Sequence, residues 1–266
     1  MKIKLPIFFK PLRFSELLRV GNKNDGGYVI SKKSLLESDC LISLGLNDDC
    51  SFEEDFKKYN DCEVFSFDNT VHNKFWIKKI ANDFLNLIFL DFKNFIKNNH
   101  IYLYFRYMKF FSQKGNTHIK KNISRKGFFG PKIYSSNSID FIEAFNSINK
   151  NNVFLKIDIE GYEYRFLDQI LEIQHKLSGL AIEFHACDLH LEKIKNFIYK
   201  FELKLIHLHH NNRSAITNNS LPAGLELSFA TEKNTEIRSI DTSYPNKYDS
   251  PNNSNLKDLE IKFNEN

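Results

Sequence analysis

Short apolar runs alternate with amphipathic stretches along most of the chain. Runs bounded by turn residues and long enough for a buried strand lie at 40–44, 63–68, 153–158 and 180–184. Amphipathic stretches that predict helices follow them at 51–59, 138–148, 162–177 and 189–201. Two further runs, 203–209 and 225–229, are predicted to form a final strand pair. This alternation predicts an α/β fold with a mostly parallel sheet and helices on both faces.

Local signals refine this pattern at the beginning of several elements. Asp25-Gly26 precedes an apolar β-branched run and predicts a turn into a strand. Ser51 stands three positions before Glu54, which is the spacing of a capping box that begins a helix. Ser138 is expected to cap the helix that ends at Ile148, and 14–18 is compatible with a short helix.

The remaining stretches suggest how the chain is divided. We expect an N-terminal lid segment at 1–38, a main domain at 39–235 and a polar tail at 236–266. The main domain contains an aromatic, mostly helical insertion at about 72–135, of which 113–135 is read as a loop. The tail lacks periodicity and is expected to be loosely ordered.

Composition narrows the possible classes of protein. The 37 basic and 33 acidic residues give a net charge of +4, too weak to require a nucleic acid partner. The four cysteines form no CxxC pair and are interpreted as small buried apolar residues of a cytoplasmic protein. The N-terminus has no apolar signal region, and the apolar stretch 84–92 is too short to span a membrane. The sequence does not predict an oligomeric state.

Polar residues close four of the predicted strands, and candidate chemistry lies there. In a doubly wound sheet, ligands bind beyond the carboxyl ends of the strands. The four clusters are Gly45 to Asp49, Asp68-Asn69, Asp158 to Gly161, and Glu183 with His185.

The first two clusters suit a nucleoside-containing cofactor. Gly45 allows a tight turn and the close approach of a ligand, with Leu46 and Asn47 beside it. Asp68, followed by Asn69, could accept both hydroxyls of a ribose. The alternative is that Asp68-Asn69 only begins a turn. The full GxGxxG pattern is absent, which disfavours a dinucleotide.

The segment Phe154-Leu155-Lys156-Ile157-Asp158-Ile159-Glu160-Gly161-Tyr162-Glu163 resembles the K-x-D-x-E-G-x-E strand of FkbM-type methyltransferases. The stretches 24–29, the Gly45 loop and 183–185 extend this resemblance over roughly residues 19 to 230. The Gly45 loop departs from the multi-glycine loop of the family.

The resemblance implies a Rossmann-like class I methyltransferase fold with a seven-stranded sheet, and S-adenosylmethionine as methyl donor. It implies that Gly45 and Asp68 hold the cofactor and that Asp158 and Glu160 face the reaction centre. Methyl transfer to a hydroxyl depends on positioning and on a base that removes the proton. Asp158, Glu160 or His185 could be that base, while one acid could instead bind the sulfonium. Lys156 is expected to extend along the sheet edge or to pair with an acid.

Histidines form a second candidate group. His207 and His209 alternate on one predicted strand and share a face, whereas His210 points the other way. His209 is predicted to lie near the acceptor with His185, and the alternative for each histidine is a structural role with its ring satisfied inside the protein. His185 could form a divalent metal site with Asp158 and Glu183, which are expected nearby. The spacing matches no established motif, however, and no metal is predicted.

Aromatic and basic residues gather in the insertion at 101–132. Such a patch suits sugars, phosphorylated glycans or a membrane surface, so peripheral membrane contact is one alternative, and nucleic acid would also use it. We favour an insertion helix whose aromatic side packs on the core, followed by a loop that covers the acceptor.

The sequence therefore predicts an S-adenosylmethionine-dependent O-methyltransferase acting on a glycan or sugar-containing precursor in polysaccharide biosynthesis. The principal alternative is a catalytically silent Rossmann-like module that binds carbohydrate. A nucleotide-dependent oxidoreductase is a weaker third possibility.

Overall fold

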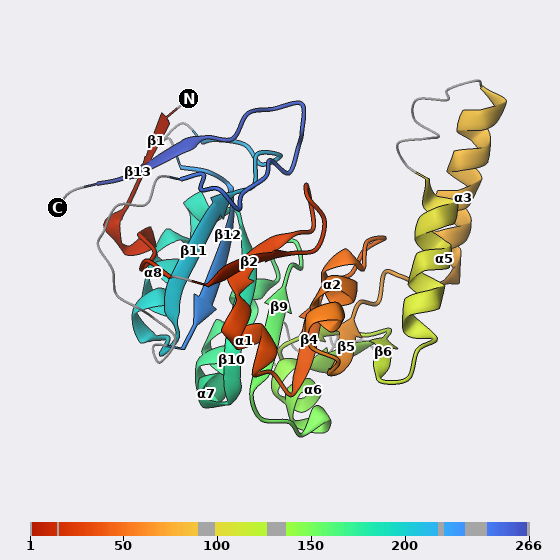
Figure 1. The fold of residues 1–266 in the computed structure, drawn as a ribbon, viewed down its shortest axis with the longest axis horizontal. Helices are drawn as coiled ribbons and strands as arrows, with labels where there is room; N and C mark the ends of the chain where they lie inside the picture. Colours follow the sequence, from red (N-terminus) through yellow and green to blue (C-terminus); the bar gives the residue numbers. More distant parts are fainter. Residues whose placement is uncertain are drawn as a thin grey trace.

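A computed structural model describes residues 2–14, 16–89, 99–126, 137–217, 221–231 and 244–264. Its central element is a seven-stranded sheet with the order β11-β12-β10-β9-β4-β5-β6 (Figure 1). The strands are β4 (Cys40–Leu44), β5 (Glu63–Phe67), β6 (Asn116–Ile119), β9 (Val153–Ile157), β10 (Leu177–His185), β11 (Lys204–His210) and β12 (Gly224–Ala230). Only β12 runs antiparallel to its neighbours in this sheet. The expected mostly parallel, seven-stranded sheet is confirmed.

Helices cover both faces of this sheet, as the alternating pattern predicts. The helices are α1 (Lys32–Leu36), α2 (Ser51–Tyr59), α3 (Asn73–Ile88), α5 (His100–Phe111), α6 (Phe141–Ile148), α7 (Leu167–Ile173) and α8 (Cys187–Lys200). One apolar core joins α6, α7 and α8 to the sheet. A second core joins α1, α2, α3 and α5 to the opposite face.

The strand β9 shows how the sequence divides these two cores. Val153, Leu155 and Ile157 belong to the first core, and Phe154 between them belongs to the second. Successive side chains of a strand point to opposite faces, so a strand covered on both sides must be apolar at every position. Lys156 is the exception, and it is 5% exposed.

Three small sheets accompany the main one. β1 (Lys2–Leu5) pairs in parallel with β13 (Glu260–Phe263), which brings the two ends of the chain together (Figure 1). β2 (Leu17–Val20) and β3 (Tyr28–Ser31) form an antiparallel hairpin, and β7 (Asn122–Ser124) pairs with β8 (Ser138–Asp140). Short 3-10 helices lie at Ile7–Phe9, Glu163–Arg165 and Gln174–Lys176.

Several local predictions are wrong because tertiary contacts or other polar groups prevail. The segment 14–18 is compatible with a helix, but its last two residues, Leu17 and Leu18, belong to β2, which pairs with β3. Ser51 is the first residue of α2 and not its cap, since its hydroxyl binds Asp49 Oδ2 at 2.8 Å and accepts from Asn22 N at 3.0 Å. Asp140, not Ser138, caps α6 by accepting from Ile142 N at 3.0 Å.

The insertion is partly as expected. On α5, Tyr107 and Phe110 pack into the second core, which confirms that its aromatic side is partly buried. Within the stretch read as a loop, β6 and β7 are strands. The proposed acceptor-covering loop falls mainly on 127–136, which lie outside the described residues.

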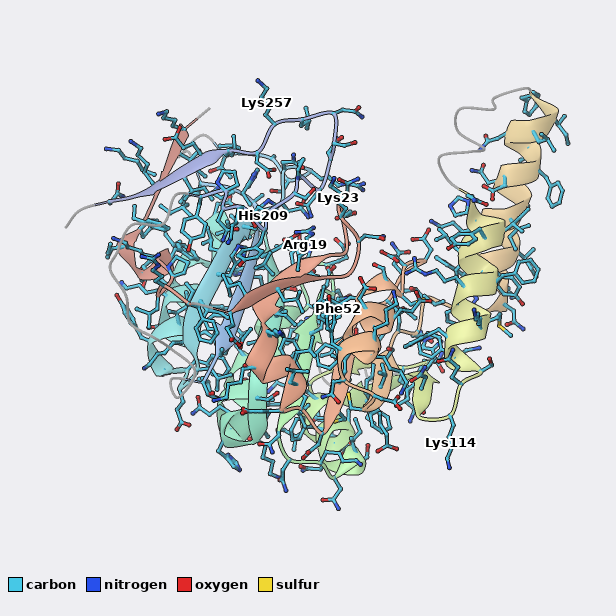
Figure 2. All side chains as sticks on the ribbon, in the orientation of Figure 1. Arg19, Lys23, Phe52, Lys114, His209 and Lys257 are labelled. Carbon is cyan, nitrogen blue, oxygen red and sulfur yellow. The ribbon has the colours of Figure 1, made fainter. Side chains whose placement is uncertain are left out.

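The tail is not loosely ordered over 244–264, because polar side chains fix it to the sheet. Asp249 Oδ1 lies 3.0 Å from His207 Nε2, and Asp258 Oδ2 lies 3.2 Å from His209 Nε2. Asn252 Nδ2 donates to Glu226 Oε1 at 2.7 Å. Figure 2 shows His209 at the end of the sheet that this segment covers. The sequence pattern missed these contacts because they join residues distant along the chain.

Among the described residues, no helix is both long enough and apolar enough to cross a membrane.

We predict that Gly45→Ala strongly destabilises the protein. Gly45 has φ +88°, and an added Cβ would lie 1.8 Å from the backbone oxygen of Asp158. Gly161 also has a positive φ of +93°, but an added Cβ there meets no atom within 4 Å. Thermal unfolding should show a loss of about 1 kcal/mol for Gly161→Ala from backbone strain alone and a clearly larger loss for Gly45→Ala. Equal losses would contradict the close packing of Gly45 against Asp158.

We also predict that His209 makes stability depend on alkaline pH. Burial opposes protonation, but hydrogen bonds to Asp258 and Glu226 raise the pKa of His209 to about 10. A group with a raised folded-state pKa contributes its full stabilisation below its unfolded value of about 6.5 and loses it as the pH rises to the folded value. His209→Gln should therefore flatten the pH dependence of the unfolding free energy between about pH 6.5 and 10. A curve parallel to that of the wild type would refute this assignment.

Candidate active site at the carboxyl edge of the sheet

The strand order reverses between β4 and β9, which lie side by side at the centre of the sheet. From β4 the chain moves to β5 and β6 on one side and then crosses to β9 and β10 on the other. In open α/β sheets this switch point, beyond the carboxyl ends of the strands, is where ligands bind. Gly45 follows β4 and Asp158 follows β9, so both predicted residues flank the switch point.

The Gly45 loop is held by Asp68, which follows β5. Asp68 Oδ2 accepts from Leu46 N at 2.9 Å and from Asn47 N at 3.0 Å. Its Oδ1 accepts from the Thr70 amide at 2.7 Å and from the Thr70 hydroxyl at 2.6 Å. Burial opposes ionisation, but these hydrogen bonds lower the pKa of Asp68. The carboxylate thus orders the loop, and its predicted contact with a ribose stays a prediction.

Asn69 lies on an open hollow beyond the end of β5. The other residues that line it are Thr70, His72, Lys74, Phe75, Lys78 and Asn137. Asn69 and the Gly45 loop are therefore brought to the same edge, because β4 and β5 are parallel neighbours.

Asp158 is held from two directions. The Tyr28 hydroxyl, from β3, donates to Asp158 Oδ2 at 3.0 Å. Burial raises the pKa of Asp158, although the charges of Lys156 and His185 oppose this rise. The Asp158 side chain is still 27% exposed, so a ligand can reach it.

Lys156 pairs with an acid, as expected, but in the interior and not at a sheet edge. Its Nζ donates to Gly45 O at 3.0 Å and lies 3.6 Å from Glu53 Oε1. Burial opposes the charge, but the carboxylates of Glu53 and Asp158 raise the pKa of Lys156. The ammonium therefore joins β9, α2 and the glycine turn.

His185 ends β10 and is oriented by the fully buried Glu163. Glu163 Oε1 accepts from His185 N at 2.8 Å and lies 3.3 Å from His185 Nδ1, while its Oε2 accepts from Gly161 N at 2.9 Å. Burial opposes protonation, but the hydrogen bond to Glu163 and the charges of Glu183, Glu163 and Asp158 raise the pKa of His185 to about 9. The raised pKa favours the protonated form of His185 at neutral pH, which disfavours it as a general base.

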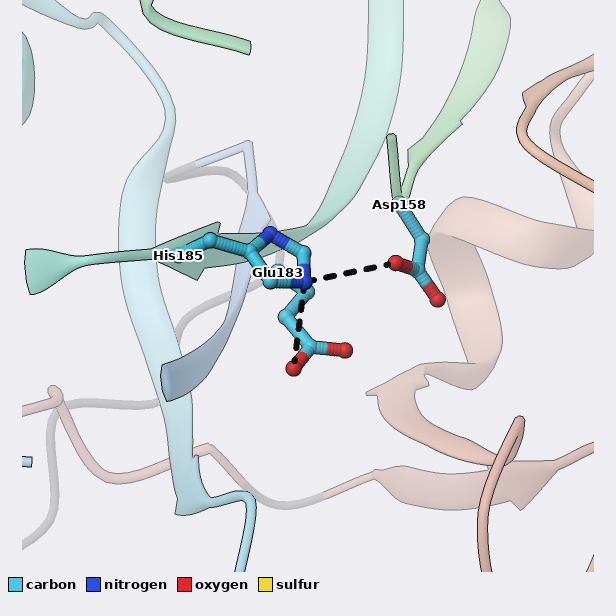
Figure 3. A group of neighbouring side chains, drawn as sticks. All are labelled: Asp158, Glu183 and His185. Atoms are coloured by element: carbon cyan, nitrogen blue, oxygen red, sulfur yellow. Dashed lines mark ion pairs between the residues drawn. The ribbon is translucent and has the colours of Figure 1, made fainter. Parts of the chain in front are cut away.

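Asp158, Glu183 and His185 converge at this edge (Figure 3). His185 Nε2 lies 3.9 Å from Asp158 Oδ1 and 3.7 Å from Glu183 Oε1. The three groups offer ligand atoms that all lie within 4.8 Å of one another. These separations exceed hydrogen bonds, and a carboxylate behind the imidazole is common where histidine binds a metal. The cluster could therefore hold a divalent cation in place of the proton on His185.

Glu183 is the most deeply buried acid of this cluster. Asn211 Nδ2 donates to its Oε1 at 2.7 Å. Burial and the neighbouring charges of Asp158 and Glu226 raise the pKa of Glu183 well above its ordinary value. Such concentrations of shifted carboxylates are typical of functional sites.

The backbone is strained at three turns of this edge. Asn47, Glu160 and Ala186 have positive φ angles of 50°, 54° and 48° and follow β4, β9 and β10. Non-glycine residues with positive φ are uncommon and gather at active sites. The Glu160 side chain is 87% exposed and lies 3.5 Å from His185 Nε2, so it borders the cluster from solvent.

His209 does not join this cluster. It is 3% exposed, and its ring nitrogens face Glu226 at 3.1 Å and Asp258 at 3.2 Å. Both nitrogens are engaged within the protein, so the structure gives His209 a role in fixing the C-terminal segment. His207 and His209 both contact this segment, which confirms that they share a face.

Two residues that position the side chains of this site, Tyr28 and Glu163, were not assigned a role from the sequence. Tyr28 lies in a segment distant from Asp158, and no local pattern links them. Glu163 is the last acid of the motif Asp158-Ile159-Glu160-Gly161-Tyr162-Glu163, so the motif contained a signal for it.

The sheet order and the single antiparallel strand agree with the class I methyltransferase fold that the resemblance of the sequence implies. Solved structures similar to it include the precorrin-6y C5,15-methyltransferase of Geobacter metallireducens, with 11% identity, 76% of this chain and 86% of that chain covered, and a TM-score of 0.32. An rRNA methylase from Streptococcus thermophilus has 11% identity, coverages of 76% and 93%, and a TM-score of 0.38. M. jannaschii TYW2 in complex with AdoMet has 9% identity, coverages of 82% and 89%, and a TM-score of 0.34.

No protein-family model matches the chain, and no curated protein matches it.

We predict that Glu163→Gln lowers the pKa of His185 from about 9 toward its ordinary value, because the substitution removes the negative charge nearest Nδ1. An NMR titration of the His185 ring protons measures this shift. Glu192→Gln, on the exposed side of α8, is the matched control and should leave the titration unchanged. An unaltered pKa in Glu163→Gln would show that Glu163 does not control the imidazole.

Proposed function

We propose that the protein is an S-adenosylmethionine-dependent O-methyltransferase whose acceptor is a hydroxyl of a glycan or sugar-containing precursor. The observation that carries this proposal is the convergence of Asp158, Glu183 and His185 beside the Gly45 turn at the switch point of the sheet. A carboxylate-rich edge complements a sulfonium cation, and it also supplies groups that can accept a proton.

The residues present at the switch point fit such a cofactor. A side chain at position 45 would strike Asp158, so only glycine brings these two loops together. We assign Gly45, Leu46, Asn47 and Asn69 to the cofactor side, with Asp158 at the boundary with the acceptor. Asp68 contributes by ordering the amides of Leu46 and Asn47.

S-adenosylmethionine, when bound, supplies an electrophilic methyl group on a positively charged sulfur. The chain has to orient the acceptor hydroxyl and remove its proton. Asp158 is the base that the geometry favours: Tyr28 fixes Oδ2, and Oδ1 is left toward His185. Asp158 Oδ1 would accept the proton of the acceptor hydroxyl, and the cofactor would supply the methyl group that replaces it. A raised pKa makes Asp158 a stronger base than an ordinary carboxylate.

His185 and Glu160 complete the acceptor side of this proposal. The imidazolium can donate to an acceptor oxygen through Nε2, because Glu163 occupies Nδ1. Glu160, at the solvent border, can hydrogen-bond a further hydroxyl of a sugar. The four free, buried cysteines favour a reducing compartment, so a cytoplasmic location is part of the proposal.

A catalytically silent carbohydrate-binding module remains the alternative, because such a module would keep the same fold and the same acids. The two functions differ in one measurement, the transfer of labelled methyl from S-adenosylmethionine to a cell glycan extract.

We predict that Asp158→Asn lowers the transfer rate by about 100-fold to 10,000-fold, as expected for the loss of a general base. Isothermal titration should show that the variant still binds S-adenosylmethionine. Asp61→Asn, with a 90% exposed side chain just before β5, is the control and should retain full activity. Binding of the cofactor without transfer by the wild type would favour the silent module.

The same assay tests whether methyl transfer requires a divalent cation at the cluster of Asp158, Glu183 and His185. If the cation bridges Asp158, Glu183 and His185, a chelator should abolish transfer and Mg²⁺ or Mn²⁺ should restore it. Unchanged activity after chelation would leave proton transfer by Asp158 as the mechanism.

A further inference from the structure

The helices α3 and α5 lie side by side and stand out from the sheet (Figure 1). Their base is joined to the second core through Trp76, Tyr107 and Phe110. Buried Asp83 fixes the pair by accepting from His100 N at 2.7 Å and binding His100 Nδ1 at 2.6 Å. The hairpin is therefore built into the fold, yet much of its surface contacts nothing else in the described protein.

An exposed apolar stripe runs along α3. Ile77, Phe84, Leu85 and Ile88 are 66%, 53%, 50% and 71% exposed. Their spacing of i, i+7, i+8 and i+11 places them on one side of a helix. Trp76 and Asp83 are buried and lie on the other side. Contiguous exposed apolar surface of this kind marks an interaction site.

The apolar surface is greatest at the end of α3 distant from the core. Leu87 and Phe89 there are 40% and 77% exposed. On α5, Tyr102 and Phe105 are 58% and 64% exposed. Aromatic side chains are well suited to the boundary between water and lipid.

The charges of the hairpin are almost entirely cationic. Lys74, Lys78 and Lys109 are exposed, while the only acid among residues 73–89 and 99–111 is the buried Asp83. The other two basic residues of this pair are engaged at its base, Lys79 with Asp48 at 2.6 Å and Arg106 with Glu54 at 2.6 Å. The hairpin thus presents an apolar stripe along α3 and uncompensated positive charge nearer its base, since Lys74 and Lys78 lie near the beginning of α3 and Lys109 near the end of α5.

We propose that the α3–α5 hairpin docks the protein peripherally on an anionic lipid surface. Apolar side chains enter the interface while lysines attract anionic headgroups, and the two effects together give stable binding. A second copy of the chain is a poorer occupant, because it would bring lysine against lysine. Nucleic acid would use the cations but leave the aliphatic stripe in water.

Sedimentation of the full chain with vesicles tests this proposal. One set of vesicles contains phosphatidylcholine alone, and the other contains phosphatidylcholine with about 30% phosphatidylglycerol. We expect binding to the anionic vesicles that weakens with salt and is much lower on neutral vesicles. The double variant Phe84→Ser with Ile88→Ser should weaken binding by at least about tenfold. Lys74→Glu with Lys78→Glu should weaken it by at least about fivefold per lysine and reduce its salt dependence.

The control is Tyr199→Ser, a 65% exposed aromatic residue on α8 that should bind vesicles as the wild type does. Circular dichroism confirms that each variant is folded. The proposal would be overturned by equal binding to both vesicle types, by no binding, or by unchanged binding of the hairpin variants. It would also be overturned if sedimentation velocity showed that the hairpin substitutions only abolish self-association. Vesicle binding requires no methyl donor, so its outcome is independent of the proposed reaction.

Discussion

The candidate site depends on one buried carboxylate that joins two strand ends. Glu163 is inaccessible to solvent, and it accepts from the amides of Gly161 and His185. The first amide belongs to the turn after β9 and the second to the last residue of β10, so Glu163 links the ends of these two strands. An unpaired buried carboxylate is strongly unfavourable, so the two strand ends are obliged to stay where they satisfy it. This constraint fixes His185 and the turn that contains Glu160, while Tyr28 holds Asp158 from the other direction.

Charge balance explains why so many acids can lie close together at this edge. Asp158, Glu163 and Glu183 surround His185, and the protonated imidazole offsets part of their repulsion. Lys156 does the same from the interior, where it also binds the backbone of Gly45. Removing charge from one of these groups must change the pKa of the others, because they interact at short range in a partly dry environment. This coupling lets the edge respond to a cationic ligand or to a proton.

The sequence predicted the features that depend on local pattern. Apolar runs located the strands β4, β5, β9 and β10, and the polar residues after them were correctly expected to share one edge. What failed depended on contacts between distant segments. Ser51 has the spacing of a helix cap, but Asp49 and Asn22 engage its hydroxyl. Histidine is a residue type common in active sites, but the C-terminal segment folds back and places Asp258 against the ring of His209. Tyr28 could not be paired with Asp158 before the hairpin β2–β3 was placed over the sheet.

Asp68 illustrates how a residue can serve a ligand without touching it. An acid at this position predicts ribose binding, yet its oxygens accept from Leu46, Asn47 and Thr70. Ordering a loop costs conformational entropy, and a loop that is already ordered spares the ligand that cost. Asn47 needs this support in particular, because its φ of 50° is an uncommon backbone conformation. The close packing of Gly45 against the backbone of Asp158 then links this loop to the turn that carries the Asp158 carboxylate. The loop that we propose for the cofactor and the turn that we propose for the acceptor are therefore packed together, so that a shift of one must displace the other.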